Sequence, residues 1–170
     1  MSRLRRLVVS NRYFFVTCNL RKDGDPATQM SEADFAGLAS VIAATRLTLR
    51  FQLTAWVFLP DHWHAVIFPP HPLTISSVMK IIKSRSTRRL LRDRGTGGEL
   101  WQARFYEHAL RTVKEYHDCL RYIHRNPVKR GLVTQQEEWK WSSIHSDGGP
   151  QEPIMPVDPV RLPSDLQARI

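Results

Sequence analysis

Two histidines separated by one residue could together bind a divalent cation. They occur in the segment His62-Trp63-His64, which has the composition of a β-strand. Side chains alternate along a strand, so we expect His62 and His64 on one face and Trp63 on the other, where it can face a core. Two adjacent imidazoles suit chelation of one metal ion. A pair of ordinary surface histidines has the same spacing, so this alternative stays open.

A tyrosine and an asparagine, Tyr122 and Asn126, lie four residues apart in a segment with helical periodicity. This spacing stacks them on one helix face, away from the apolar stripe of the same segment. The stripe consists of Val113, Tyr116, Leu120 and Ile123. Tyr122 is therefore available for chemistry. The alternatives are a half-buried ring with a solvated hydroxyl, and an asparagine that merely ends a helix before Pro127.

Positive charge dominates the chain, with 25 Lys and Arg against 16 Asp and Glu, a formal net charge of +9. We expect a polyanionic partner such as nucleic acid, with an anionic membrane surface as the rival. Candidate DNA contacts are Lys80, Lys83, Arg85, Arg88, Arg89 and Arg92 in one helical segment, and Arg121, Arg125, Lys129 and Arg130 around Tyr122. A solvated charged face is the alternative, but the scarcity of neighbouring acids favours phosphate contacts.

Alternating strands and helices could position these groups. Aromatic and β-branched runs predict strands at residues 12–20, 51–58, 62–68 and 105–111. Apolar residues at helical spacing predict helices that begin after Ser31, at Ile75 and at Thr112, and we expect Pro127 to end the last one near Asn126. The order of elements predicts an α+β fold, a ferredoxin-like βαββαβ sandwich with an antiparallel sheet, followed by one further helix that carries the tyrosine.

Length and composition fit one ordinary globular domain. We expect this domain to span residues 1–147 of the 170, because the chain is too short for two substantial domains and a linker. Residues 148–170 are rich in proline, which predicts a poorly ordered tail or one draped over the surface. The longest apolar run is Ala55 to Leu59, whereas a membrane-spanning helix needs about 20 residues, and the start lacks the apolar stretch of a signal peptide. We therefore expect a cytoplasmic protein.

Three motifs, in this order, resemble those of the REP-associated tyrosine transposases, single-tyrosine HUH endonucleases of the IS200-like superfamily. The first motif reads DHWH from Asp61 to His64, and the second reads LWQARFYEH from Leu100 to His108. The third reads YIHRNPVKRGLV from Tyr122 to Val133. The resemblance covers about residues 12–143, and the three motifs together are far more specific than any one of them.

The resemblance implies roles for four residues. In HUH endonucleases the histidine pair binds Mg²⁺ or Mn²⁺, which corresponds to His62 and His64 here. The helical tyrosine is the nucleophile and corresponds to Tyr122, and a polar residue one turn later, here Asn126, completes the metal site. The implied reaction is a transesterification on single-stranded DNA that leaves a 5′-phosphotyrosine and a free 3′ hydroxyl, so that religation needs no nucleotide cofactor.

The family also implies a partner and a location. The substrate would be a repetitive extragenic palindrome folded as a hairpin, with a short single-stranded guide sequence beside its stem, and the protein would associate with the nucleoid as a monomer or a homodimer. Two rival functions use the same residues: a non-catalytic nucleic-acid-binding protein, and a metal-dependent phosphoesterase that uses water while Tyr122 is a bystander. The roles of Glu107 and His108 stay open.

Overall fold

The computed structural model describes residues 12–21, 29–147 and 152–160. At its centre is an antiparallel four-stranded sheet in the order β2-β3-β1-β4. The strands are β1 (Phe14–Asn19), β2 (Gln52–Leu59), β3 (His62–Phe68) and β4 (Tyr106–Ala109), close to the predicted ranges. Strand β3 lies between β2 and β1, and its residues are buried on both faces of the sheet except at Phe68, which is partly exposed.

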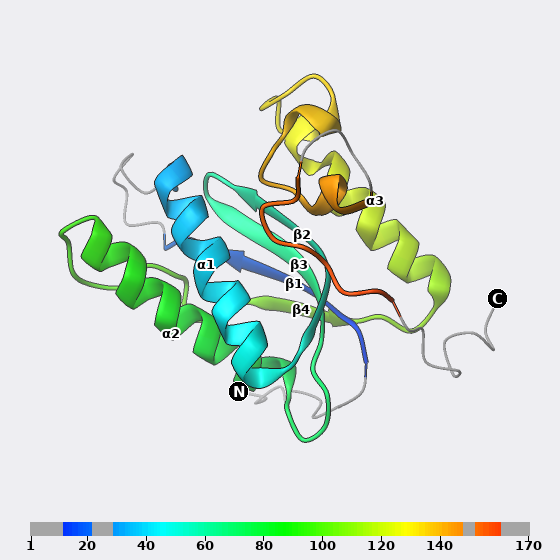
Figure 1. Cartoon of the computed structure of the whole chain (residues 1–170), viewed down its shortest axis with the longest axis horizontal. Helices are drawn as coiled ribbons and strands as arrows, with labels where there is room; N and C mark the ends of the chain where they lie inside the picture. Colours follow the sequence, from blue (N-terminus) through cyan, green and yellow to red (C-terminus); the bar gives the residue numbers. More distant parts are fainter. Residues whose placement is uncertain (1–11, 22–28, 148–151, 161–170) are drawn as a thin grey trace, which may run out of the picture.

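Three helices cover the sheet. They are α1 (Glu32–Leu49), α2 (Ile75–Asp93) and α3 (Val113–Lys129), and two short 3₁₀ turns, η1 (Gln136–Glu138) and η2 (Ser143–Asp147), follow α3. Figure 1 shows α1 and α2 together on one face and α3 on the other. The predicted α+β, ferredoxin-like βαββαβ arrangement is confirmed, with α3 as the additional helix.

The sheet separates two apolar clusters of different size. Alternate residues of β3, namely Trp63, Ala65 and Ile67, face α1 and α2 and join the larger cluster. The smaller cluster lies under α3 and includes Val57, Val66, Tyr116 and Ile123. The two-residue period of a strand thus assigns neighbouring residues of β3 to different cores.

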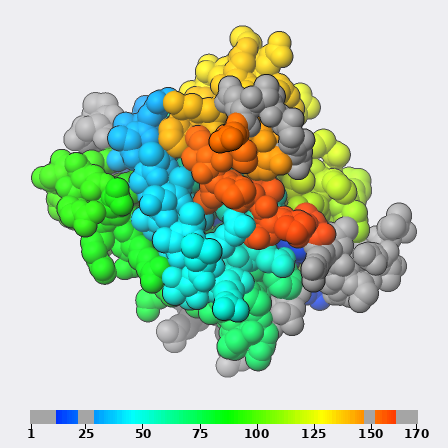
Figure 2. Space-filling model, viewed as in Figure 1, coloured from blue at the N-terminus to red at the C-terminus, as the bar shows by residue number. Residues whose placement is uncertain are grey.

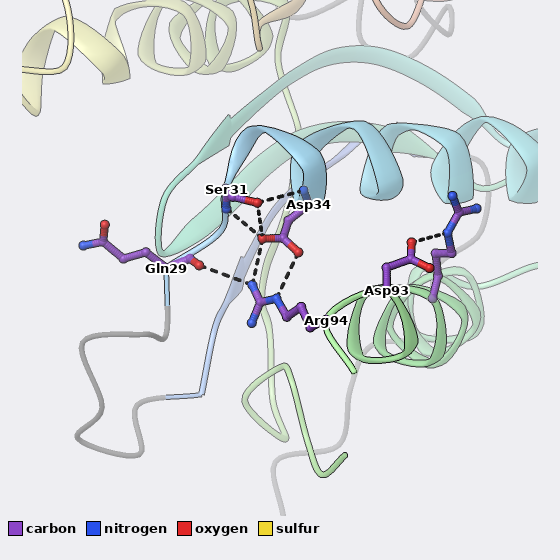
Figure 3. A network of polar contacts seen from close by, with 6 residues as sticks. Gln29, Ser31, Asp34, Asp93 and Arg94 are labelled. Atoms are coloured by element: carbon purple, nitrogen blue, oxygen red, sulfur yellow. Dashed lines mark hydrogen bonds and ion pairs between the residues drawn. The ribbon is translucent and has the colours of Figure 1, made fainter. Parts of the chain in front are cut away.

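A network of polar contacts ties the start of α1 to the end of α2 (Figure 3). Ser31 caps α1: its Oγ accepts from the backbone N of Asp34 at 3.3 Å, and Asp34 Oδ2 accepts from the Ser31 backbone N at 2.7 Å. Arg94 donates to both oxygens of Asp34, at 2.9 and 3.0 Å. Burial raises the pKa of the Asp34 carboxyl, but Arg94 and Ser31 outweigh this and hold the pKa below its usual value.

Helix α3 runs past its proline. We expected Pro127 to end the helix near Asn126, and this prediction is wrong, because α3 continues to Lys129 with Pro127 inside it. A proline removes one backbone donor, but the last turn still closes through Arg130 N, which donates to Asn126 O at 3.0 Å. The consequence for the site is that Lys129 stays on the helix, about two turns from Tyr122.

Part of the expected C-terminal tail packs against the domain. In Figure 2 residues 152–160, in orange to red, lie across the visible face between α1 and α3. Met155 is buried, and its carbonyl accepts from Trp56 Nε1 at 2.9 Å. Asp158 accepts from the Leu53 backbone N and from Arg46 Nη2, both at 2.8 Å. These contacts agree with the alternative of a segment draped over the surface for residues 152–160, while residues 148–151 and 161–170 of the expected tail lie outside the described residues.

The described helices also bear on the membrane expectation. Within residues 12–21, 29–147 and 152–160, no helix combines the length and apolarity that crossing a bilayer requires. The start of the chain, on which the signal-peptide expectation rests, lies outside the described residues.

Candidate active site

Two buried imidazoles meet on the α3 face of the sheet. His62 and His64 lie on β3, and 7% and 3% of their surfaces are exposed. Their Nε2 atoms are 3.0 Å apart, with the two rings at 78° to each other. Trp63 points the other way, into the larger core. The predicted placement of both histidines on one face is confirmed, and the alternative of two surface histidines is wrong.

Each histidine is held through its other ring nitrogen. His62 Nδ1 lies 2.7 Å from Asp61 Oδ1, and His64 Nδ1 lies 2.8 Å from Thr17 Oγ1. A carboxylate only accepts hydrogen bonds, so His62 donates from Nδ1 and its neutral ring keeps a lone pair on Nε2. Asp61 also accepts from Arg130 Nη2 at 3.0 Å. A carboxylate behind a histidine is common in metal sites, where it orients the ring.

The surroundings keep both rings neutral. Burial, and after it the neighbouring His62, lower the pKa of His64 to about 3. Burial also lowers the pKa of His62, although Asp61 opposes this shift. An imidazole must be unprotonated to bind a metal ion. Both histidines are therefore in the form that a metal ligand requires at neutral pH.

Helix α3 brings a third polar group to the same point. Asn126 is buried, and its Nδ2 lies 3.2 Å from His64 Nε2. An amide carries an oxygen and a nitrogen at equivalent positions, and a half turn of the side-chain amide exchanges them. His62 keeps a lone pair on Nε2, so His64 Nε2 carries the proton between the two rings, and the Asn126 amide suits this nitrogen when it presents its oxygen there. Asn126 is more than a helix-end residue, since its side chain belongs to the histidine cluster.

These three groups fit a divalent cation. The two imidazole Nε2 atoms, 3.0 Å apart, are directed at the same point, where a cation with nitrogen ligands could be held. Within the described parts of the chain, His, Cys, Asp and Glu form no cluster of three suited to a metal ion. The amide of Asn126, which lies beside His64, is a third group that could contribute to a cation site here. Imidazole nitrogens suit Mn²⁺ at least as well as Mg²⁺, which prefers oxygen.

Tyr122 is the exposed member of this cluster. Its side chain lies at the edge of the site, with 44% of the residue exposed. The ring centroid is 5.3 Å from that of His64 and 5.8 Å from that of Phe15. Lys129 Nζ lies 5.8 Å from the same ring. The prediction that Tyr122 lies off the buried stripe is confirmed, whereas Tyr116 of that stripe is buried.

Cationic side chains line a surface pocket beside Tyr122. The pocket has a volume of about 480 Å³, and its cations are Arg121, Arg125 and Lys129. Arg121 pairs with Asp118, whereas within the described residues Arg125 forms no ion pair. Arg130, the fourth basic residue predicted here, pairs with the carboxylate behind the histidines. The structure thus places three of the four in the pocket and gives the fourth a supporting contact.

Helix α2, which carries six of the predicted DNA contacts, lies on the opposite face of the sheet from α3, which carries Tyr122 (Figure 1). Two of the predicted DNA contacts have partners inside the protein. Lys83 Nζ donates to the carbonyls of residues 102 and 103, at 2.6 and 2.9 Å. Arg85 Nη1 donates to Thr45 Oγ1 on α1 at 3.3 Å. These contacts connect α2 to α1 and to residues 102–103, so both side chains also stabilise the packing of α2.

The remaining basic residues of α2 divide into two pairs. Arg89 and Arg92 pair with Asp93 at the end of the helix. Lys80 and Arg88 are exposed, and across the described residues neither forms an ion pair. The sequence therefore predicted the charge of α2 but not its separation from the tyrosine by the whole sheet.

Three residues that complete the site had no role in the sequence analysis. Asp61 directly precedes the histidine pair, so its position in the motif was a usable signal for a supporting carboxylate. Phe15 stacks on His64, with centroids 5.3 Å apart and planes at 26°. Thr17 and Phe15 belong to β1, far from β3 in sequence, and only the strand pairing brings them to the histidines. Of the residues left open, His108 has its Nε2 3.6 Å from Glu115 Oε2 on α3.

Comparison with known proteins agrees with this geometry. Residues 9–126 match the family described as "Transposase IS200 like". Over 149 residues the chain is 34% identical to the "REP-associated tyrosine transposase" of Escherichia coli (strain K12), a match that covers 86% of this chain and 85% of that protein. A solved structure of the REP-associated tyrosine transposase bound to a REP hairpin is similar, with a TM-score of 0.73 and 31% identity, over 95% of this chain and 94% of that one.

The fold and these matches define the class of protein. The chain belongs to the IS200-like transposase family, in its group of REP-associated tyrosine transposases. Membership of this family implies a DNA transposase or endonuclease activity.

Proposed function

We propose that this protein is a metal-dependent endonuclease and transposase that nicks and rejoins hairpin-forming repetitive palindromic DNA through a covalent 5′-phosphotyrosine on Tyr122. One observation carries the proposal: the ring of Tyr122 lies against His64, whose Nε2 meets His62 and Asn126. A nucleophile and a set of neutral metal ligands thus share one small cluster, which is the arrangement that metal-assisted phosphoryl transfer requires.

The DNA substrate rests on the relatives and on the charge of this chain. One relative is named for REP elements, and a similar solved structure holds a REP hairpin. Here the cations Arg121, Arg125 and Lys129 surround the tyrosine, in a chain of net charge +9. Such a pocket attracts a phosphate backbone. A single-stranded segment would reach Tyr122 there, next to the stem of the hairpin.

The proposed chemistry is a reversible exchange of esters. The Tyr122 oxygen bonds to phosphorus and gives up its proton to solvent, while the bond from phosphorus to the 3′ oxygen breaks and that oxygen takes a proton from solvent and leaves as a hydroxyl. The 5′ phosphate stays on the tyrosine. Attack by a 3′ hydroxyl on this ester rejoins the strand and returns the phenol, so no nucleotide cofactor is consumed.

The other residues of the site bind and orient. His62, His64 and Asn126 would hold Mg²⁺ or Mn²⁺, which supplies Lewis-acid polarisation of the phosphate when bound. Asp61 and Thr17 fix the histidine rings through Nδ1, so that both Nε2 atoms stay directed at the same point. Phe15 packs against both His64 and Tyr122, which holds the phenol beside the ligands.

The decisive experiment is product analysis. Purified protein is incubated with labelled hairpin DNA that carries a single-stranded flank, in Mn²⁺ or Mg²⁺, and the products are separated on a denaturing gel. We expect a covalent adduct in which label 3′ of the nick travels with the protein, because the 5′ phosphate of that fragment is esterified. Free cleavage without adduct would favour a water-using phosphoesterase, and binding without cleavage would favour a non-catalytic DNA-binding protein.

A further inference from the structure

A second exposed tyrosine lies on the same face of the sheet as the proposed nucleophile. Tyr106 is on β4, at the edge of the sheet, and 57% of it is exposed. It pairs with Thr17 of β1, whose side chain contacts His64, so Tyr106 belongs to the face that carries the histidines. Helix α3 packs mainly over β2 and β3, and Tyr106 at the far edge of the sheet stays exposed beside it.

One aromatic ring connects this tyrosine to the site. Phe15 lies between the two tyrosines: its centroid is 6.2 Å from that of Tyr106 and 5.8 Å from that of Tyr122, with interplanar angles of 67° and 76°. Phe15 itself is stacked on His64. The rings therefore form a continuous row from the edge strand to the helix, and the outer end of this row is open to solvent.

Rings of this kind have a known use in binding single strands. An exposed aromatic face stacks a nucleobase of any sequence, and cations alongside hold the backbone. Arg125 and Lys129 provide such cations in the pocket beside Tyr122, at the inner end of the row. A single strand that follows the row would meet a stacking surface first and the nucleophile next.

We propose that Tyr106, supported by Phe15, stacks a nucleobase of the single-stranded DNA beside the nucleotide whose phosphate Tyr122 attacks. This inference rests on the proposed function, because it assumes that a single strand reaches Tyr122. Tyr106 is a positioning residue: it touches no reacting atom, and it fixes where along the strand the scissile phosphate comes to lie.

The test compares Tyr106→Leu, which removes the ring, with Tyr106→Phe, which keeps it. Binding is measured without divalent cations, on a hairpin with a single-stranded flank and on the same hairpin without the flank. We expect Tyr106→Leu to weaken binding of the flanked hairpin on the order of tenfold. Binding of the unflanked hairpin stays unchanged, which also reports that the protein is folded, and Tyr106→Phe binds both DNAs as the wild type does.

A fluorescent base analogue identifies the stacked position. With 2-aminopurine at successive positions of the flank, we expect one position next to the cleavage site to lose fluorescence on binding to wild type and to Tyr106→Phe, but not to Tyr106→Leu. Equal binding of the flanked hairpin by Tyr106→Leu and wild type, while wild type still forms its adduct, would overturn the stacking inference alone. Loss of binding in Tyr106→Phe as well would assign the effect to the hydroxyl and overturn stacking too.

The proposed function has a separate outcome in the same experiment. If wild type forms no adduct and binds the two hairpins equally, the proposed single-strand endonuclease is wrong, and the inference falls with it. The adduct assay on wild type therefore separates the two failures.

Discussion

The two faces of strand β3 differ in chemistry although their residues alternate along seven positions. Toward α1 and α2 the strand presents Trp63, Ala65 and Ile67 to a large apolar cluster. Toward α3 it presents, besides Val66, the polar side chains of His62 and His64, which are also buried. Burial alone therefore does not distinguish a core position from a site position in this protein.

What distinguishes the two faces is the kind of contact that each one makes. Buried polar groups are costly unless hydrogen-bonded, and here each histidine has a dedicated partner, Asp61 or Thr17. The residues that face α1 and α2 need no such partners, because they are stabilised by apolar packing alone. Substitutions of the β3 residues that face α1 and α2 should thus change stability, and substitutions of the two histidines should change chemistry.

The largest effect should come from Tyr122→Phe. This change removes one oxygen from a residue that is 44% exposed, so the free energy of unfolding should fall by about 1 kcal/mol or less. Hairpin binding should persist, because no charge changes, while strand cleavage and the covalent adduct both disappear. Denaturing gels with labelled DNA measure the chemistry, and urea unfolding measures the stability.

Tyr116 provides the matched control on the same helix. It is buried in the smaller cluster, so Tyr116→Ala should cost about 3–5 kcal/mol while the folded fraction still forms the adduct. If Tyr122→Phe cleaves without forming an adduct, water is the nucleophile and the phosphoesterase alternative replaces our proposal.

Neighbouring residues of β3 give the sharpest comparison of the faces. His64→Ala removes a proposed metal ligand and one stacking partner of Phe15, so cleavage should fall by orders of magnitude while the protein stays folded. Trp63→Ala should instead cost about 3–5 kcal/mol of stability. Below its melting temperature, that variant should keep the metal dependence of the wild type.

Cleavage titrated against Mn²⁺ checks this pair of variants. Because Trp63→Ala is costly, Trp63→Phe serves as a milder variant on the same face. Wild-type cleavage by His64→Ala at limiting metal would remove the histidine pair from the site.

The ion pair between Asp34 of α1 and Arg94 at the end of α2 should affect stability and not chemistry. The folded-state pKa of Asp34 lies below its usual value, so its ionised form stabilises the fold above the unfolded pKa of about 3.9. That contribution is lost as pH falls through the folded pKa. Asp34→Asn should lower the free energy of unfolding by about 1–3 kcal/mol at pH 7, with a smaller difference below about pH 4.

Urea unfolding of both proteins across this pH range measures the effect. Cleavage by Asp34→Asn at neutral pH should match that of the wild type. A constant stability difference from pH 7 to pH 3 would show that the ionised carboxylate does not stabilise the fold.

The fold was largely predictable because its signals are local. Alternation in residues 62–68 and helical spacing in the segment before Tyr122 each depend on neighbours in sequence, and both elements form as predicted. The exception, Pro127, was misjudged because one lost hydrogen bond does not outweigh a helix end that packs against the sheet. Tertiary contacts hold residues 152–160 against the domain, and their composition left this alternative open.

Only part of the site was predictable, because only contacts between residues close in sequence leave a pattern in the sequence. His62 and His64 lie two residues apart, and Tyr122 and Asn126 one turn apart, so spacing alone grouped each pair. Nothing in the sequence shows that β1 supplies a hydroxyl and a ring to this site, because those contacts depend on strand order. The arrangement of the strands and their connections likewise places α2 and its basic residues on the face of the sheet opposite α3 and Tyr122.

The smallest effects should separate the two basic surfaces. Arg88 on α2 and Arg125 on α3 are exposed arginines on opposite sides of the sheet. If the α2 surface contacts the duplex stem, Arg88→Ala should weaken binding of both flanked and unflanked hairpins a few-fold. It should also make the slope of log K against log salt shallower by up to about 0.9.

Arg125→Ala should act on the flanked hairpin alone, with a slope change of about 0.7, because single strands release fewer counterions. Salt titrations of both variants on both DNAs measure these slopes. Identical slope changes for the two variants would mean that stem and flank contact both surfaces. The two faces of the sheet would then differ in catalysis but not in DNA binding.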